Sequence, residues 1–184
     1  QGSSTLRTKM IEEARRRVET DTRQGITLLS SKIGIFPPGY FFRASLGGVK
    51  GLVLSPTSRF EELAKRYLPG WDIINIYYMP NRKRNQNRLA RVEKKLKDFD
   101  IVVIGVANEL QVPWAQACKK KEVPFAVLSV DNPYAALPFA ADALFAAASY
   151  SPYSPSIEAL FDAVFVTGKF PGRLPYLYSG GMDE

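Results

Sequence analysis

The stretch Pro124-Phe-Ala-Val-Leu-Ser-Val-Asp-Asn-Pro-Tyr134 decides how this chain folds. Apolar residues dominate from Val123 to Val130, which predicts a strand buried on both faces, and the Asp-Asn-Pro exit is typical of a turn. An earlier segment, Asp100-Ile-Val-Val-Ile-Gly-Val106, is the most continuous apolar run that predicts a strand. Because buried strands joined by helices are typical of parallel sheets, the pair indicates an α/β fold.

The alternation of strands and helices extends outward from this pair. Strands are expected at Ile26–Ser30, Val49–Ser55, Asp72–Tyr78, Asp100–Val106, Val123–Val130, Ala143–Ala147 and Leu174–Tyr178. Helices are expected at Thr5–Arg23, Ser58–Tyr67, Asn85–Asp98, Pro113–Lys121 and Ser156–Val166. The sequence therefore predicts a three-layer α/β/α sandwich around a mostly parallel sheet of about six strands, with flavodoxin-like layering.

A length of 184 residues fits one folded domain. We expect residues 1–24 to form a helix that leads into a single sandwich domain of residues 25–184, because Gly25 is a typical helix stop. Phe36-Pro-Pro-Gly39 predicts a turn. Glu61, three residues after Ser58, predicts a capping box at the start of a helix. Ser154 or Ser156 is expected to cap the last helix.

Cysteine and histidine usage restricts the chemistry. The chain has one cysteine and no histidine, which excludes an internal disulfide, a Ser-His-Asp triad, a Cys-His pair and a cysteine-based zinc site within it. We accordingly expect no metal and no cofactor. Cys118 lies in an apolar helical pattern with Trp114 and Ala117, so a packed thiol is expected rather than a nucleophile.

The net charge of +7 raises the possibility of nucleic-acid binding. Much of the excess lies in the segment Arg82–Lys97, which has no interleaved aromatic residues. Leu89, Val92, Leu96 and Phe99 instead mark one buried face of a helix there. We expect a solvated basic helix and no nucleic-acid partner, while long-range attraction to anionic cell-wall polymers stays open.

Candidate site residues follow the predicted strands, because ligands of open α/β sheets bind at the carboxyl ends of parallel strands. None of these loops is a glycine-rich phosphate loop. The candidates for contacts at a cleft rim or between domains are Asn108, Glu109, Asp131, Asn132, Tyr150 and Tyr153.

Each candidate also has an ordinary structural interpretation. Glu109 lies just past a central strand, where a carboxylate could act as a general acid. Its ordinary interpretation is a loop carboxylate near the start of the next helix. Asp131 and Asn132 are typical turn formers. The rim tyrosines, with Tyr77 and Tyr78, suit sugar stacking or interdomain packing, or they are partly buried aromatics at strand ends.

The order of several segments resembles the C-terminal α/β domain of glycoside hydrolase family 3, especially its bacterial β-N-acetylglucosaminidase branch. The segments are Ile26-Thr-Leu-Leu-Ser30 with Phe36-Pro-Pro38, then Asn132-Pro-Tyr134, then Gly168-Lys-Phe-Pro-Gly-Arg-Leu-Pro175. Asp131 stands where the family usually has glycine. The resemblance implies that this domain packs on an N-terminal catalytic barrel, which 184 residues leave no room for.

The resemblance also implies that the chemistry lies outside this chain. In the β-glucosidase branch, the acid/base glutamate lies on a Glu-Gly-x-Asp-Arg loop of this domain. The corresponding connection here, Gly105–Pro113, lacks that continuation, so the role is not transferred to Glu109. In the N-acetylglucosaminidase branch, the nucleophilic aspartate and an aspartate–histidine dyad belong to the barrel. No catalytic residue is therefore assigned, and the chain alone is expected to be inactive.

Three functions are kept open. The first is a non-catalytic domain of a β-N-acetylglucosaminidase that shapes the cleft rim for cell-wall or chitin-type glycans. The second is a freestanding cell-wall glycan-binding module, and the third is a flavodoxin-like small-molecule enzyme. The start Gln1–Thr5 gives no signal peptide, and the run Ala135–Ala148 is too short and interrupted for a membrane span. Both the bacterial cytoplasm and the cell wall remain possible compartments.

Overall fold

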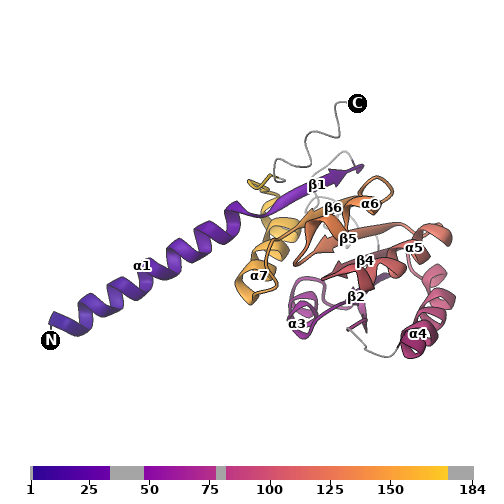
Figure 1. Cartoon of the computed structure of the whole chain (residues 1–184), viewed down its shortest axis with the longest axis horizontal. Helices are drawn as coiled ribbons and strands as arrows, with labels where there is room; N and C mark the ends of the chain where they lie inside the picture. Colours follow the sequence, from indigo (N-terminus) through magenta and orange to yellow (C-terminus); the bar gives the residue numbers. More distant parts are fainter. Residues whose placement is uncertain (1, 34–47, 78–81, 174–184) are drawn as a thin grey trace.

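The computed structural model describes residues 2–33, 48–77 and 82–173. The turn predicted at Phe36–Gly39, the rim candidate Tyr78 and the strand predicted at Leu174–Tyr178 lie outside these ranges. Within them, the chain forms one six-stranded sheet with helices on both faces (Figure 1).

The sheet has the order β1-β6-β5-β4-β2-β3. The strands are β1 (Thr27–Ser31), β2 (Gly51–Ser55), β3 (Asp72–Asn75), β4 (Ile101–Val106), β5 (Phe125–Ser129) and β6 (Phe145–Ala148). All neighbouring pairs are parallel except β1 with β6, which is antiparallel. The prediction of a mostly parallel sheet is confirmed. The two long apolar runs form β4 and β5, the central pair, and both are buried along their whole length.

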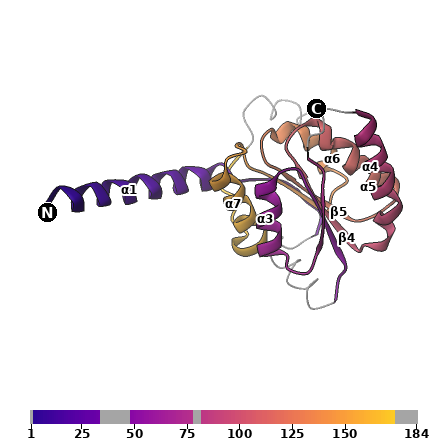
Figure 2. The same cartoon turned by 90° about the horizontal axis from the view of Figure 1, so that it is seen from below.

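Helices cover both faces of the sheet (Figure 2). One face carries α3 (Ser58–Tyr67) and α7 (Ser154–Asp162), and the other carries α4 (Arg82–Lys95), α5 (Val112–Lys120) and the short α6 (Leu137–Ala140). Two separate apolar clusters fill the spaces between the layers. The three-layer α/β/α sandwich is therefore confirmed, and its two cores draw on alternate residues of the same strands.

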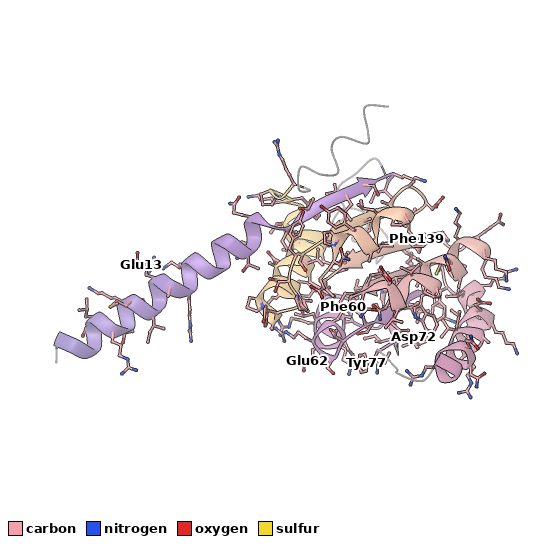
Figure 3. All side chains as sticks on the ribbon, viewed as in Figure 1. Glu13, Phe60, Glu62, Asp72, Tyr77 and Phe139 are labelled. Atoms are coloured by element: carbon pink, nitrogen blue, oxygen red, sulfur yellow. The ribbon has the colours of Figure 1, made fainter. Side chains whose placement is uncertain are left out.

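The first helix extends away from the sandwich. Helix α1 spans Gly2–Gln24, and its C-terminal part lies beside α7 (Figures 1 and 2). Side chains from residue 5 to residue 16 are exposed, among them Glu13, which points into solvent (Figure 3). Leu6 and Met10 are 62% and 63% exposed, and Ile11 is 48% exposed. The helix thus presents large apolar side chains that are about half or more exposed. None of the described helices is long and apolar enough to cross a bilayer.

Two predicted helix caps are wrong. Helix α3 does begin at Ser58, but its N-cap is Thr57, whose hydroxyl accepts a hydrogen bond from the Phe60 N–H at 3.2 Å. Glu61 is then one position too far along for a capping box. The N-cap of α7 is Tyr153, which makes no side-chain cap bond, so neither Ser154 nor Ser156 has that role. Since Pro155 favours the first helical turn, α7 starts earlier than predicted.

Element ends also differ from the expectation. Strand β3 stops at Asn75, and Ile76 and Tyr77 follow it outside the ladder. Helix α6 lies inside the apolar run between β5 and β6, where no helix was predicted. Helix α7 continues as a π-helical turn, Ala163–Thr167, which ends at Gly168 with a φ of 65°. Glycine suits that left-handed position because it has no Cβ.

Candidate functional site at the carboxyl edge of the sheet

Loops after four parallel strands meet at one edge of the sheet. They follow β2 at Ser55, β4 at Val106, β5 at Ser129 and β6 at Ala148. Because β2, β4, β5 and β6 are consecutive neighbours and run in the same direction, their carboxyl ends lie side by side. This carboxyl edge carries all six candidate residues.

Buried serines fix the bases of three of these loops. Ser55 Oγ donates to the Thr57 carbonyl at 2.8 Å, and Ser129 Oγ donates to the Asn132 carbonyl at 2.8 Å. After β6, Ser149 Oγ lies 3.4 Å from the Ser151 carbonyl in the same arrangement. All three serines are at most 1% exposed. Their hydroxyls therefore serve the loop backbone.

The fourth loop is held by Gln111. Its side-chain oxygen accepts hydrogen bonds from the backbone N–H groups of Ala107 and Asn108, both at 2.9 Å, and the residue is 1% exposed. The Asn108 side chain in turn accepts from the Leu110 N–H at 2.9 Å. Together these bonds make a capping box for the 3₁₀ turn Glu109–Gln111. The predicted candidate Asn108 thus shapes the loop, and Glu109 is exposed in its first turn.

Of the two candidate residues after β5, one shapes the loop and the other is exposed, as in the loop after β4. The Asn132 side chain accepts from the Tyr134 N–H at 3.0 Å and caps the 3₁₀ turn Pro133–Ala135. Asp131 is exposed beside it. The turn-forming interpretation of Asn132 is therefore correct, while Asp131 has its carboxylate at the surface of the edge.

The two rim tyrosines have different surroundings. Tyr150 is half-buried, its hydroxyl donates to the Arg173 carbonyl at 2.9 Å, and it lies 3.2 Å from Thr27 Oγ1. It connects β1 to the segment that contains Arg173. Tyr153 is 76% exposed. Of the two, Tyr153 alone is presented to solvent as a stacking or packing residue would be.

Two further exposed apolar side chains lie at the same edge. Leu110 is 43% exposed on the loop after β4, and Tyr134 is 40% exposed on the loop after β5. With Tyr153 they form a set that we call the rim residues, one from each of three adjacent loops. Sequence reasoning missed Leu110 and Tyr134 as site residues. The available signal was a large apolar residue placed two residues after turn-forming Asn108 and Asn132.

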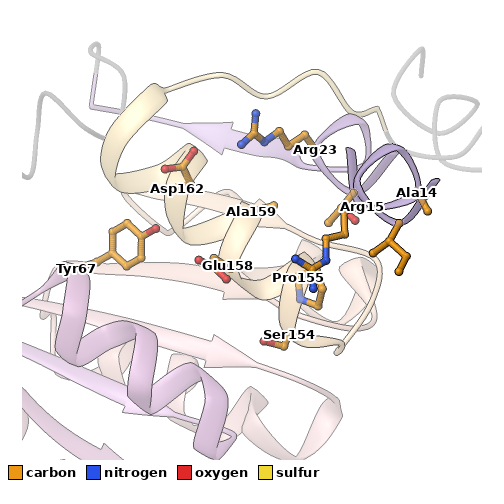
Figure 4. Close-up of a pocket in the computed structure, with 11 residues that line it drawn as sticks. Ala14, Arg15, Arg23, Tyr67, Ser154, Pro155, Glu158, Ala159 and Asp162 are labelled. Carbon is orange, nitrogen blue, oxygen red and sulfur yellow. The ribbon is translucent and has the colours of Figure 1, made fainter. Parts of the chain in front are cut away.

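A hollow of about 740 Å³ lies where α1 meets α7 (Figure 4). Tyr67, Glu158 and Asp162 contribute side chains from α3 and α7, opposite Arg15 and Arg23 of α1. Glu158 is bound by Arg59 at 3.1 Å and by Arg66 at 3.3 Å. Burial and the two carboxylates raise the pKa of Tyr67. Glu158 is therefore engaged in ion pairs with two arginines of α3.

The cysteine and the acidic groups add no chemistry at the edge. Cys118 is fully buried among Trp114 and Ala117, as predicted, and burial raises the pKa of its thiol to about 12. Among the residues in the described ranges, no three Asp, Glu or Cys side chains gather in a way that could hold a metal ion. The carboxyl edge therefore offers fixed loops, exposed rim residues and single carboxylates.

Comparison with known proteins gives a consistent fold. The chain is similar to a glycoside hydrolase family 3 β-N-acetylglucosaminidase from Paenibacillus, with a TM-score of 0.61 and 20% identity over 86% of this chain and 31% of that one. It is similar to a β-glucosidase from Listeria innocua, with a TM-score of 0.60 and 12% identity over 84% of this chain and 26% of that one. It is also similar to a β-glucoside phosphorylase, with a TM-score of 0.54 and 15% identity over 88% of this chain and 31% of that one.

No protein-family model and no curated protein matches the chain. At these identities the structural likeness shows the fold. The chain thus has the fold of a part of family 3 glycosidases, and it spans about a quarter to a third of the length of the solved structures it matches.

Proposed function

We propose that this chain is the C-terminal α/β domain of a family 3 glycosidase and works beside a catalytic barrel. The observation that carries the proposal is the share of this chain, and of the matched enzymes, over which the structures align. Between 84% and 88% of the chain aligns with these enzymes, yet it accounts for 31% or less of each. A chain of 184 residues has no room for a barrel as well.

The carboxyl edge is the face that we propose meets the barrel. Its loops are fixed by internal hydrogen bonds, which suits an interface that must keep its shape. The rim residues Leu110, Tyr134 and Tyr153 are large apolar groups left exposed on those fixed loops. Exposed aromatic and aliphatic side chains gathered on one face mark interaction surfaces.

The finer proposal is a β-N-acetylglucosaminidase. It is supported by the sequence resemblance and by the identity to the Paenibacillus enzyme, which is 20% against 12% for the Listeria enzyme. The short loop Gly105–Pro113 also supports it, because it lacks the acid/base pattern of the β-glucosidase branch. In this proposal the barrel supplies both catalytic groups, and this domain orders the rim of the sugar cleft.

Hydrolysis assays test the proposal. The chain alone, and the complete product of its gene, are each incubated with chromogenic N-acetyl-β-glucosaminide and β-glucoside. The expected result is no turnover by the chain alone and turnover of the N-acetylglucosaminide by the complete product. Robust turnover by the chain alone would overturn the claim that catalysis lies elsewhere. Preference of the complete product for the glucoside would overturn the finer assignment only.

A second candidate function is a glycan-binding module that acts without a barrel. The 76% exposure of Tyr153 favours it, because carbohydrate rings stack on exposed aromatic side chains. Retention on insoluble peptidoglycan at low salt, lost in Tyr153→Ala, would support this function. If the chain is not retained, the module hypothesis fails and the barrel-associated domain stands.

A further inference from the structure

The positive charge of the chain is concentrated in one segment. Residues 82–98 contain eight Lys or Arg and two Asp or Glu, a net charge of +6 out of +7 for the chain. The remaining 17 basic and 16 acidic residues nearly cancel. A field of one sign at one place attracts ligands of the opposite sign far more than the same charge spread over the surface.

This segment borders a groove at the edge of the sheet. The groove has a volume of about 330 Å³. One wall is the run Ile73–Asn75 of β3, and the other is the α4 flank with Arg88, Arg91, Val92 and Lys95. Among the described residues β3 pairs only with β2, so its outer backbone edge borders this groove without a neighbouring strand from that part of the chain.

Within the described ranges, no carboxylate forms an ion pair with the groove cations. Ion pairs are found on α3, between α3 and α7, and between Lys119 and Asp142, and none of these includes Arg88, Arg91 or Lys95. Arg88 donates to the Asn75 carbonyl at 2.9 Å, which holds it across the groove. Arg91 and Lys95 are exposed. Their charges are therefore available to a ligand.

The spacing of the cations suits a chain-like anion. Arg88 and Lys95 are seven residues apart, so they are spread over about 10 Å along the helix axis. Anionic groups repeated along a polymer can contact cations at both ends of that row at the same time. The described residues that line the groove include no aromatic ring, so they give nucleobases no stacking platform. The open edge of β3 provides backbone N–H and C=O groups, which can pair with hydroxyl groups.

We propose that the groove between β3 and α4 binds an acidic polysaccharide, a glycan that carries carboxylates or phosphates along its length. Arg91 and Lys95 contact the anionic groups, and the edge of β3 contacts the sugar hydroxyls. The preference for anions rests on the groove itself, and the choice of a glycan rests on the proposed function. This site lies on the open edge beyond β3, whereas the rim residues follow β4, β5 and β6.

Binding of the full chain to soluble polymers tests the proposal. Polygalacturonate is the acidic glycan, pullulan is the neutral glycan, and poly-glutamate and poly(dT) are the other polyanions. We expect polygalacturonate to have the highest affinity per negative charge of the polymer, and pullulan not to bind. The logarithm of the affinity for polygalacturonate should fall linearly with the logarithm of the salt concentration, as expected when counterions are released.

Two double variants separate the groove from the general field. Arg91→Gln with Lys95→Gln removes two groove cations, and Lys94→Gln with Lys97→Gln removes two charges from the same segment outside the groove. We expect the first to weaken polygalacturonate binding about tenfold and to lower the salt slope by about 1 to 2. The second should change the affinity less than about twofold. All four residues are exposed, so folding is unaffected.

Three results would overturn the proposal. The first is no binding of polygalacturonate at low salt, which would mean that the cations only protect the open edge of β3 from pairing with other chains. The second is equal weakening by both double variants. The third is tighter binding of poly-glutamate or poly(dT), which would point to an acidic peptide or a nucleic acid. Failure here leaves the hydrolysis assays untouched, because those depend on the barrel.

Discussion

The Tyr77 hydroxyl donates a hydrogen bond of 2.6 Å to the Glu61 carboxylate, and this contact joins the end of β3 to α3. The two side chains are 16 residues apart in the sequence. Figure 3 shows Tyr77 beside α3, at the side of the sheet where β3 ends. The hydrogen bond from Tyr77 is the main cause that lowers the pKa of Glu61, with Lys65 adding to it. Burial, and then the bond to Glu61, raises the pKa of Tyr77.

This contact predicts a pH window for stability. A lowered carboxyl pKa stabilises the fold above the unfolded value of about 4.5, and this contribution is lost as the pH falls. A raised tyrosine pKa stabilises the fold below the unfolded value of about 10, and this contribution is lost as the pH rises. Tyr77→Phe should therefore cost about 1 kcal/mol at pH 7 and less at pH 4. Urea unfolding at both pH values measures this cost.

Tyr134→Phe is the control, because that tyrosine is exposed at the carboxyl edge. Its free energy of unfolding should match the wild type at both pH values. An equal loss for Tyr77→Phe at pH 7 and pH 4 would show that the charge of Glu61 contributes nothing.

Gln111 predicts a larger effect at the loop after β4. Gln111→Ala leaves the N–H groups of Ala107 and Asn108 without their acceptor, which should cost about 2 kcal/mol. Gln116→Ala, on the exposed side of α5, should cost less than about 0.5 kcal/mol. Thermal unfolding measures both. Equal stabilities of the two variants would mean that the Gln111 bonds do not hold the loop.

Gly105 predicts a packing limit inside β4. A Cβ there would lie 2.3 Å from Pro56 Cδ and 2.8 Å from Phe60 Cζ, so Gly105→Ala should destabilise the chain by about 1 to 3 kcal/mol. At Gly25 the nearest atoms would be 3.4 Å and 3.6 Å away, and Gly25→Ala should be close to neutral. Chemical denaturation compares the two variants. A neutral Gly105→Ala would contradict the close approach of β4 to α3.

Much of the fold is predictable because β4 and β5 are apolar on both faces, and only a buried central strand meets that description. The antiparallel pairing of β1 with β6 was not predicted, since Ile26–Ser30 contains nothing that fixes the direction of an edge strand. Helix α6 was missed because the run Ala135–Ala148 is mostly apolar, and its residue pattern does not separate a helix from β6. Local residues set the strands, and long-range pairing sets their order.

The candidate site was predictable in position and less so in its residues. Asn108 and Asn132 are at the carboxyl edge, as expected, but their side chains cap local turns. The Tyr150 hydroxyl forms hydrogen bonds with Thr27 and Arg173, which are distant in the sequence. The exposure of Leu110 depends on how the Gln111 side chain turns the loop, and the sequence does not reveal that contact.

The most direct measurement is a calorimetric titration of this chain with the catalytic barrel encoded in the same reading frame. We predict measurable association, weakened at least about tenfold when Leu110, Tyr134 and Tyr153 are all changed to Ser, because these groups carry the apolar contact. Val166→Ser is the control, since Val166 is 59% exposed at the end of the last helix. Absence of a barrel, no association, or equal affinity of the triple variant and the wild type would contradict the proposed role.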